Sequence, residues 1–274
     1  MPTCTAEAVD PTGAGGLCPD HVPDTGEDVG SPDEKPTLEA DKPASTTSET
    51  PDTDGSVLVE ALEWFHQQLD RDLPDECDHD TPRDYYREGR GWGADTIDGK
   101  LLGFAPANYK DELVSHLFDR GHGREAILST GLFGERDGGN LYATWSGRYV
   151  FPYFDADGRP VFAISRATDP IHSADWKGNK YDKLQVTRDD VTAEEPIYGL
   201  DTVRDGEPVL ITEGIADAIT AHQAGYPCLS PVTTQFKTGD REDLLEALGE
   251  RGVGRVYLIQ DAQGESRRAP ATWP

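Results

Sequence analysis

Residues 209–232 read VLITEGIADAITAHQAGYPCLSPV and predict a strand, a helix and a second strand. A second helix over 240–251 and a third strand over 253–261 follow in the same order. Short strands that alternate with helices are typical of a parallel sheet covered by helices. We therefore expect the C-terminal part of the chain to fold as a parallel α/β domain.

Acidic residues follow two of these strands. Glu213 ends the strand VLIT, Asp217 lies one helical turn further on, and Asp261 ends the third strand. Sites in open α/β sheets form beyond the carboxyl ends of the strands, so Glu213 and Asp261 can reach the same edge. Clustered carboxylates suit a hard cation such as Mg²⁺. The pattern alone leaves open that these acids only cap helix N-termini.

The region before residue 200 has a different pattern. Apolar residues at helical spacing predict one amphipathic helix, with Val57, Leu58, Ala61, Leu62, Phe65 and Leu69 on its buried face. Short aromatic and β-branched stretches after residue 140 predict strands, and Asp155–Gly158 is a hairpin signal between two of them. We expect an α/β fold overall, with a mixed helical and β subdomain over 57–200 and a parallel domain over 201–274.

Seven segments occur in a familiar order. They are GRGWGADTIDGKLLGFAPA (89–107), TGLF (130–133), GRYVFPYFDADGRPVFAISRA (147–167), NKYDKLQ (179–185), IYGLDTV (197–203), VLITEGIADAITAHQAGYPCLSPVTTQF (209–236) and VYLIQDAQGE (256–265). Together they resemble the catalytic core of bacterial-type (DnaG-type) DNA primases. The last two resemble the TOPRIM domain, which primases share with topoisomerases.

The resemblance implies roles for individual residues. Glu213 would be the general acid/base or a metal ligand, and Asp217 and Asp261 would complete the acidic cluster around Mg²⁺ or Mn²⁺. Basic side chains would contact the template strand or the incoming nucleotide, since Arg and Lys suit phosphate; they are Arg148, Arg166 and Lys180. A surface ion pair with this acidic chain is the alternative for the two arginines.

The sequence departs from the family at three places. Gln263 replaces the second acid of the Asp-x-Asp pair, and Glu265 is the nearest substitute. Glu194, Glu195 and Pro196 stand where the family has a basic residue. After Asp261 the chain lacks the helix and strand that the resemblance implies, so we expect a C-terminally truncated, incomplete TOPRIM domain.

Residues 1–56 contain few large apolar side chains that could form a core. Cys4, Cys18 and His21 in residues 1–21 resemble half of a zinc knuckle, but a structural zinc needs four ligands, so we expect a degenerate knuckle without zinc. Residues 22–56 are rich in Pro, Ser, Thr, Asp and Glu and predict a disordered acidic linker.

The net charge of −27 is opposite to that of most nucleic-acid enzymes. Residues 1–56 carry −11 of it, and the remaining −16 lies on the folded part. Either the protein does not touch nucleic acid, or it works at about 1 M salt or more, where screening acts within about 3 Å. Seventeen Arg and eight Lys, with many Asp, indicate an extreme halophile. No signal peptide or membrane-length apolar run is present, which predicts a cytoplasmic protein with reduced thiols.

These observations predict a primase-like nucleotidyltransferase. It would make short RNA primers on single-stranded DNA from nucleoside triphosphates during replication, with a replicative helicase as a candidate partner. Two alternatives remain open: an inactive TOPRIM protein that binds single-stranded DNA or a partner, and a TOPRIM nuclease.

Overall fold

The computed structural model describes residues 53–170, 179–231 and 238–259, as a single unit that excludes residues 1–48. The predicted knuckle residues Cys4, Cys18 and His21 therefore lie outside the described residues, as do Asp261, Gln263 and Glu265. The first helix begins at Thr53, inside the segment 22–56 that the sequence assigned to the linker.

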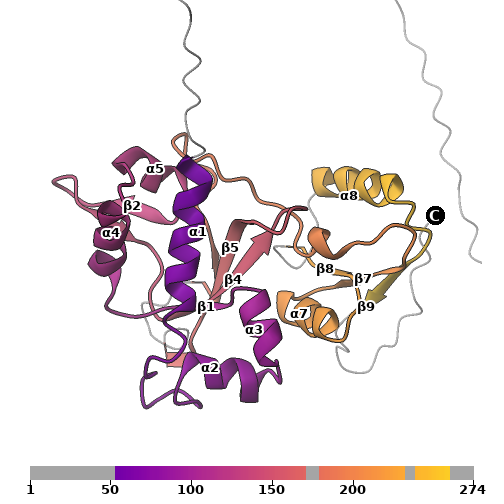
Figure 1. Ribbon diagram of the computed structural model, residues 1–274, viewed down its shortest axis with the longest axis horizontal. Coiled ribbons are helices and arrows are strands. Elements are labelled where there is room, and N and C mark those ends of the chain that lie inside the picture. The colour runs from indigo at the N-terminus through magenta and orange to yellow at the C-terminus, as the bar shows by residue number, and fades with distance from the viewer. Residues whose placement is uncertain (1–52, 171–178, 232–237, 260–274) are drawn as a thin grey trace, which may run out of the picture. The chain divides into compact units, whose positions relative to one another are not determined.

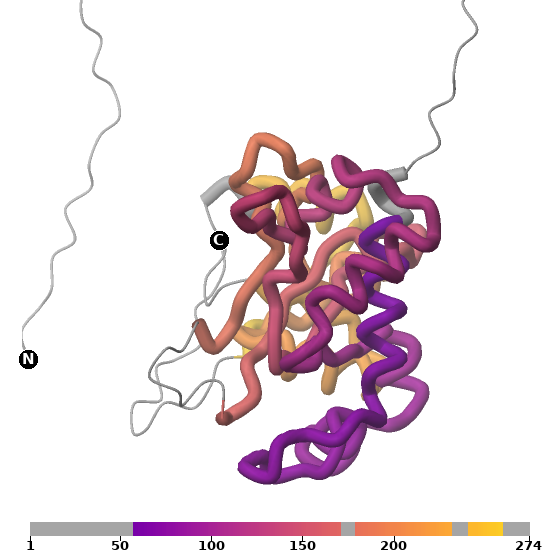
Figure 2. Tube along the Cα trace, turned by 90° about the vertical axis from the view of Figure 1, so that its left-hand side faces the viewer, coloured from indigo at the N-terminus to yellow at the C-terminus, as the bar shows by residue number. Residues whose placement is uncertain are grey.

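Helix α1 (Thr53–His66) contains the predicted apolar stripe as far as Phe65 and ends before Leu69. All six residues of that stripe are at most 4% exposed, which confirms the prediction of a buried face. The helix packs on strands β1 (Gly103–Ala105) and β5 (Pro160–Ala167) and on helices α4 (Lys110–Asp119) and α5 (Arg124–Ser129). Figures 1 and 2 show α1 in indigo running beside these elements.

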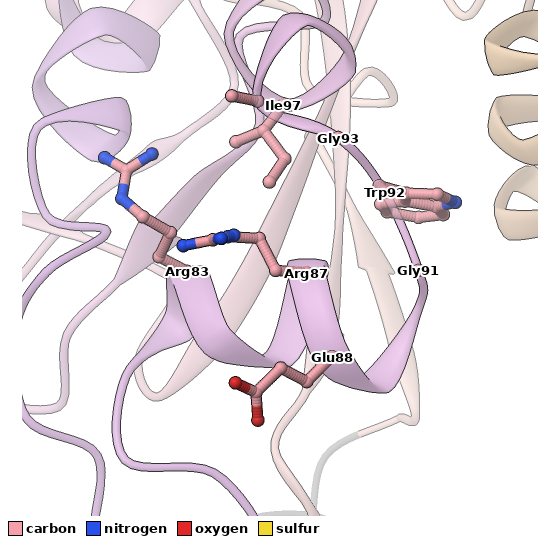
Figure 3. A pocket seen from close by; sticks show the side chains of 8 residues that line it. Arg83, Arg87, Glu88, Gly91, Trp92, Gly93 and Ile97 are labelled. Atoms are coloured by element: carbon pink, nitrogen blue, oxygen red, sulfur yellow. The ribbon is translucent and has the colours of Figure 1, made fainter.

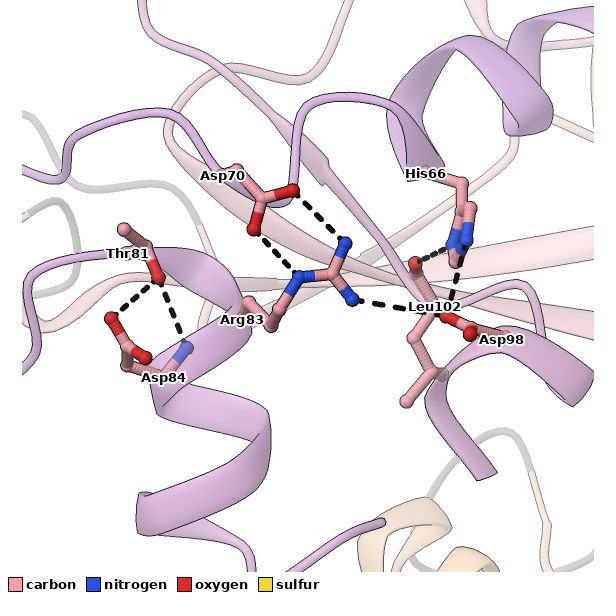
Figure 4. A network of polar contacts seen from close by, with 7 residues as sticks. All are labelled: His66, Asp70, Thr81, Arg83, Asp84, Asp98 and Leu102. Carbon is pink, nitrogen blue, oxygen red and sulfur yellow. Dashed lines mark hydrogen bonds and ion pairs between the residues drawn. The ribbon is translucent and has the colours of Figure 1, made fainter. Parts of the chain in front are cut away.

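Three short helical segments follow α1. Helix α2 (Pro82–Asp84) begins at the cap Thr81, whose Oγ1 accepts a hydrogen bond from the Asp84 amide at 3.1 Å. It continues into a π-helical turn, η1 (Tyr85–Gly89), and then into α3 (Ala94–Gly99). Arg83 ties this region to its neighbours, because it donates to Asp70 at 2.6 Å and lies 3.8 Å from Asp98 (Figure 4).

The main sheet is antiparallel, with the order β1-β4-β5-β6. Strand β4 (Arg148–Phe154) pairs with β5 along its whole length, and β6 (Tyr181–Lys183) closes the sheet beside β5. The turn between β4 and β5 is the predicted hairpin, where Gly158 adopts a φ of 76°. A separate hairpin joins β2 (Phe133–Glu135) and β3 (Leu141–Ala143).

The second sheet is parallel, with the order β8-β7-β9. Strand β7 (Val209–Thr212) lies between β8 (Cys228–Leu229) and β9 (Val256–Ile259). Helices α7 (Ile215–Gln223) and α8 (Thr238–Glu250) connect the strands (Figure 1). This strand–helix alternation confirms the predicted parallel sheet and is consistent with an incomplete TOPRIM domain.

The two faces of the parallel sheet have different cores. Leu244 and Leu248 of α8 pack with Val209, Ile211 and Leu229 in a small cluster. In contrast, α7 contributes to the large core of the mixed subdomain through Ile215, Ala218 and Ile219. A single apolar core therefore joins α7 to the antiparallel sheet.

The connection between the sheets depends on Gly199, just before the 3-10 turn η2 (Leu200–Thr202). Gly199 has a φ of 85°, and a Cβ there would overlap the carbonyl oxygen of Cys228. Glycine is the residue that tolerates both conditions. Among the described helices, none is long and apolar enough to cross a membrane.

Candidate active site

A cavity of about 690 Å³ lies between strand β6 and the end of strand β7. The β6 side presents Lys180, Tyr181 and Lys183, and the β7 side presents Glu213 and Asp217. Sites of open α/β sheets lie beyond the carboxyl ends of the strands, which is where β7 ends. The structure thus brings together three of the residues predicted for the site: Lys180, Glu213 and Asp217.

The two carboxylates lie at the start of α7. Glu213 is half-buried and directly follows β7, and Asp217 is exposed in the first turn of the helix. Asp217 Oδ2 lies 3.0 Å from the position that a Cβ would take at Gly214, so this carboxylate folds back over the glycine. The positive end of the helix dipole favours acids at this place.

Glu213 and Asp217 offer two carboxylates to a divalent cation at this edge. Mg²⁺ in enzymes of phosphate esters is commonly held by one or two carboxylates plus substrate oxygens. Within the described ranges, no group of three or more His, Cys, Asp or Glu side chains could hold a metal. Ile259 of β9 pairs in parallel with Thr212, so the chain leaves β9 at the edge where Glu213 lies. The predicted third acid, Asp261, lies outside the described residues.

Arg148 is buried, so its guanidinium group is not exposed for the predicted contact with nucleic acid. The residue is 5% exposed and pairs with Asp182 at 3.2 Å, while its Nη2 donates to the Asn179 carbonyl oxygen at 3.0 Å. Burial lowers the pKa of Arg148, and the charge of Asp182 opposes that shift. Because Asn179 and Asp182 line the cavity, Arg148 supports the cavity wall from behind.

Arg166 converges with Arg90 on one hydroxyl group. Arg90 Nε donates to the Tyr85 hydroxyl at 2.8 Å, and Arg166 Nη1 donates to the same oxygen at 3.3 Å. Both guanidinium groups also lie within 6 Å of the Tyr85 ring centre, at 5.3 and 5.6 Å. The ring stacks on Tyr149 at 3.8 Å. A buried aromatic pair thus holds two positive charges side by side.

Sequence reasoning missed Arg90 and Tyr85. Arg90 lines the cavity, and Tyr85 orients it from the π-helical turn. The motif GRGWG contains Arg90, but its glycines interrupt every periodic pattern, so no face could be assigned to the arginine. No sequence pattern singles out Tyr85, and the structure places it against Tyr149 and Arg166.

The β6 wall combines cationic and aromatic groups. Tyr181 is 40% exposed, and Lys180 lies 5.9 Å from its ring centre. Burial raises the pKa of Tyr181, while the charges of Arg166 and Arg90 act in the opposite direction. Lys183 pairs with Glu195 at 2.6 Å, so one of the acids found in place of the family's basic residue neutralises this lysine. Among the described residues, the structure pairs neither Arg90 nor Lys180 with a carboxylate.

A second cavity, of about 520 Å³, lies under η1 and contains none of the predicted site residues. Figure 3 shows Arg83 and Arg87 on one side of it, with Trp92 pointing away from both. Arg83 is already held by Asp70 and Asp98, and Glu88 adds a further negative charge. The cavity beside β7 is therefore the better candidate for the chemistry.

Comparisons with the sequences and structures of known proteins support this fold. The family "DNA primase catalytic core, N-terminal domain" matches residues 65–182. The DNA primase of Deinococcus radiodurans is 30% identical over 189 residues, which are 67% of this chain and 31% of that primase. The RNA polymerase domain of Mycobacterium tuberculosis DnaG, solved with double-stranded DNA, superposes with a TM-score of 0.65 at 19% identity, covering 78% of this chain and 65% of that domain. A DnaG catalytic domain bound to single-stranded DNA gives a TM-score of 0.55 at 20% identity, covering 75% of this chain and 62% of that one.

The fold is therefore the mixed α/β fold of a primase core. More particularly, residues 65–182 are similar to the N-terminal domain of the DNA primase catalytic core. The chain spans about a third of the length of the Deinococcus primase.

Proposed function

We propose that this chain is a primase-like nucleotidyltransferase, which makes short RNA primers on single-stranded DNA from nucleoside triphosphates. One observation carries the proposal: the carboxylates of Glu213 and Asp217 face Lys180, Tyr181 and Arg90 across one cavity. Primer synthesis needs this combination, because carboxylates serve the reacting centre while cations hold phosphate groups.

The cationic wall would hold the nucleic acid and the nucleotide. Arg90 and Lys180 would contact phosphate oxygens, and Arg166, which also pairs with Asp169 at 3.4 Å, lies beside Arg90 on Tyr85. The exposed face of Tyr181 offers a surface for base stacking, which contributes about 1–3 kcal/mol per base in single-strand binding. Relatives solved with DNA support this role, including the domain bound to single-stranded DNA.

The parallel sheet would act as a TOPRIM domain with Glu213 and Asp217 as metal ligands or, for Glu213, as the general base. A bound Mg²⁺ or Mn²⁺ would neutralise phosphate charge while a 3′-hydroxyl attacks the α-phosphorus of the nucleoside triphosphate and pyrophosphate leaves. Glu213 would accept the proton of that hydroxyl or hold the metal, and Asp217 would be a further ligand. Asp261 is proposed as a third ligand, with Gln263 or Glu265 as neutral or charged support.

The negative net charge of the folded part suggests a protein that acts at high salt concentration. A net charge of −16 on residues 57–274 would repel a polyanion in dilute buffer. At about 1 M salt, repulsion beyond about 3 Å is screened, and direct contacts such as those of Arg90 and Lys180 decide binding. We therefore propose that the protein comes from a halophile. A replicative helicase remains a proposed partner that no feature of the fold specifies.

Primer synthesis tests the proposal directly. The reaction contains about 2–3 M KCl, Mg²⁺ or Mn²⁺, single-stranded DNA and labelled nucleoside triphosphates. Glu213→Gln should abolish the product, whereas Glu63→Gln, the same change at an exposed site on α1, should leave it unchanged.

The same assay separates the alternatives. A protein that makes no primer, and whose affinity for DNA is the same with and without the Glu213→Gln substitution, would be a binding module. Metal-dependent cleavage of DNA without nucleotides would instead identify a TOPRIM nuclease.

A further inference from the structure

Gln223 of helix α7 makes two hydrogen bonds to the loop that follows Arg90. Its Oε1 accepts a hydrogen bond from the Gly93 amide at 2.7 Å, and its Nε2 donates to the Gly91 carbonyl oxygen at 3.0 Å. The amide thus satisfies a backbone donor and a backbone acceptor of the same loop, as a neighbouring strand would do. Both hydrogen bonds join residues about 130 positions apart in the chain.

Trp92 anchors the same loop. Its side chain is 2% exposed and stacks on Tyr86 with ring centres 5.7 Å apart, and its Nε1 donates to Thr220 Oγ1 of α7 at 3.1 Å. In Figure 3 the ring of Trp92 points away from Arg83 and Arg87, with Gly91 and Gly93 on either side of it. Residues 91–93 are therefore fixed at three points to α7.

This attachment joins two segments that each contribute a residue to the candidate site. Arg90 immediately precedes the attached loop, and Asp217 lies on the same helix as Gln223, about 9 Å away along its axis. A second link, the ion pair between Lys100 and Asp201 at 3.2 Å, has both side chains more than four-fifths buried. Because this pair and the Trp92 contact remain when Gln223 is changed, removing the amide should loosen the loop without unfolding the protein.

We propose that Gln223 is a positioning residue: its amide fixes the loop after Arg90 relative to Asp217 of α7 and so sets the width of the site. The consequence for nucleic acid rests on the proposed function, whereas the attachment itself does not. Gln223 acts through Arg90, and it contacts neither the cavity nor the reacting groups.

The attachment is tested first by hydrogen exchange, measured by NMR at the Gly93 amide. In the unmodified protein this amide should exchange slowly, and in Gln223→Ala it should exchange at least about tenfold faster, since its acceptor is gone. Gln67→Ala, which removes an exposed amide just beyond α1, is the matched control and should leave Gly93 protected. A Gly93 amide that exchanges equally fast with and without Gln223 overturns the proposal.

A double-mutant cycle tests the positioning role. Single-stranded DNA affinity at about 1 M KCl is measured for Gln223→Ala, Arg90→Ala and the double variant. Gln223→Ala alone should weaken binding about fivefold to tenfold, and in the Arg90→Ala background it should change binding less than twofold, because the group that it positions is absent. If the losses of binding free energy of the two single variants add up to that of the double variant, Gln223 does not act through Arg90, and the proposal is overturned. If the unmodified protein fails to bind single-stranded DNA, the proposed function fails, and the Gly93 exchange still decides whether the attachment exists.

Discussion

Replacing Gly199 by alanine should be among the most destabilising small changes in the described part of the chain. Two effects add at this position. The φ of 85° lies in the left-handed region, where a residue with a Cβ is about 1–2 kcal/mol less stable. In addition, the new Cβ would overlap the Cys228 carbonyl oxygen, which belongs to strand β8 and can move only with the strand.

The hydrogen bonds around this contact set the size of the second effect. Moving β8 away from Gly199 weakens the bond from the Ser230 amide to the Tyr198 carbonyl at 3.1 Å. It also weakens those from the Cys228 amide to Thr202 Oγ1 at 3.2 Å and from His222 Nε2 to the Cys228 carbonyl at 2.7 Å. Each contributes about 0.5–1.5 kcal/mol. We therefore expect Gly199→Ala to lower the free energy of unfolding by about 3–6 kcal/mol.

Gly206→Ala is the matched control. Gly206 has a φ of 72° but nothing lies within 4 Å of a Cβ there, so only the backbone effect of about 1–2 kcal/mol applies. Urea unfolding of both variants at one fixed KCl concentration gives the difference, which isolates the overlap with β8. Equal losses for the two variants would refute the reasoning, since they would show that β8 does not press on Gly199.

Two further predictions concern single side chains. Burial, with the charge of Lys100, lowers the pKa of His222 to about 4. In the unfolded chain this imidazole takes up its proton near pH 6.5. About 3 kcal/mol of the stability present above pH 6.5 should therefore be lost as the pH falls to 4. His222→Gln should remove that part of the pH dependence in unfolding experiments at several pH values, and a pH profile identical to that of the unmodified protein would contradict the assigned shift. Tyr85→Phe keeps the stack on Tyr149 but removes the oxygen shared by Arg90 and Arg166, so single-stranded DNA affinity should fall about tenfold, or about 1.4 kcal/mol. Tyr109→Phe is the control: it loses a buried hydrogen bond to the Trp145 carbonyl oxygen and should leave the affinity for single-stranded DNA unchanged. Equal affinities of the unmodified protein, Tyr85→Phe and Tyr109→Phe would show that the Tyr85 hydroxyl does not position the two arginines.

Local sequence determined the elements and their order. The helical spacing from Val57 to Phe65 produced α1, and the turn at Asp155–Gly158 produced the main hairpin. The strand VLIT followed by Glu213-Gly214 produced the junction between β7 and α7. These features follow from residues close together in the chain, because periodicity, turn chemistry and helix starts are local properties.

The composition of the site depended on contacts between distant residues. Arg148 was expected among the phosphate contacts, but the pairing of β4 with β5 and β6 buries it against Asp182. Arg90 carried no periodic signal, yet Tyr85 and the attachment to Gln223 bring it to the cavity. Sequence alone established that carboxylates end a parallel strand and that cations precede them in the chain. Only the tertiary structure decided which cations face those carboxylates. Burial and the pairing of side chains more than a hundred residues apart depend on how the sheets and helices pack, and no local pattern in the sequence encodes that packing.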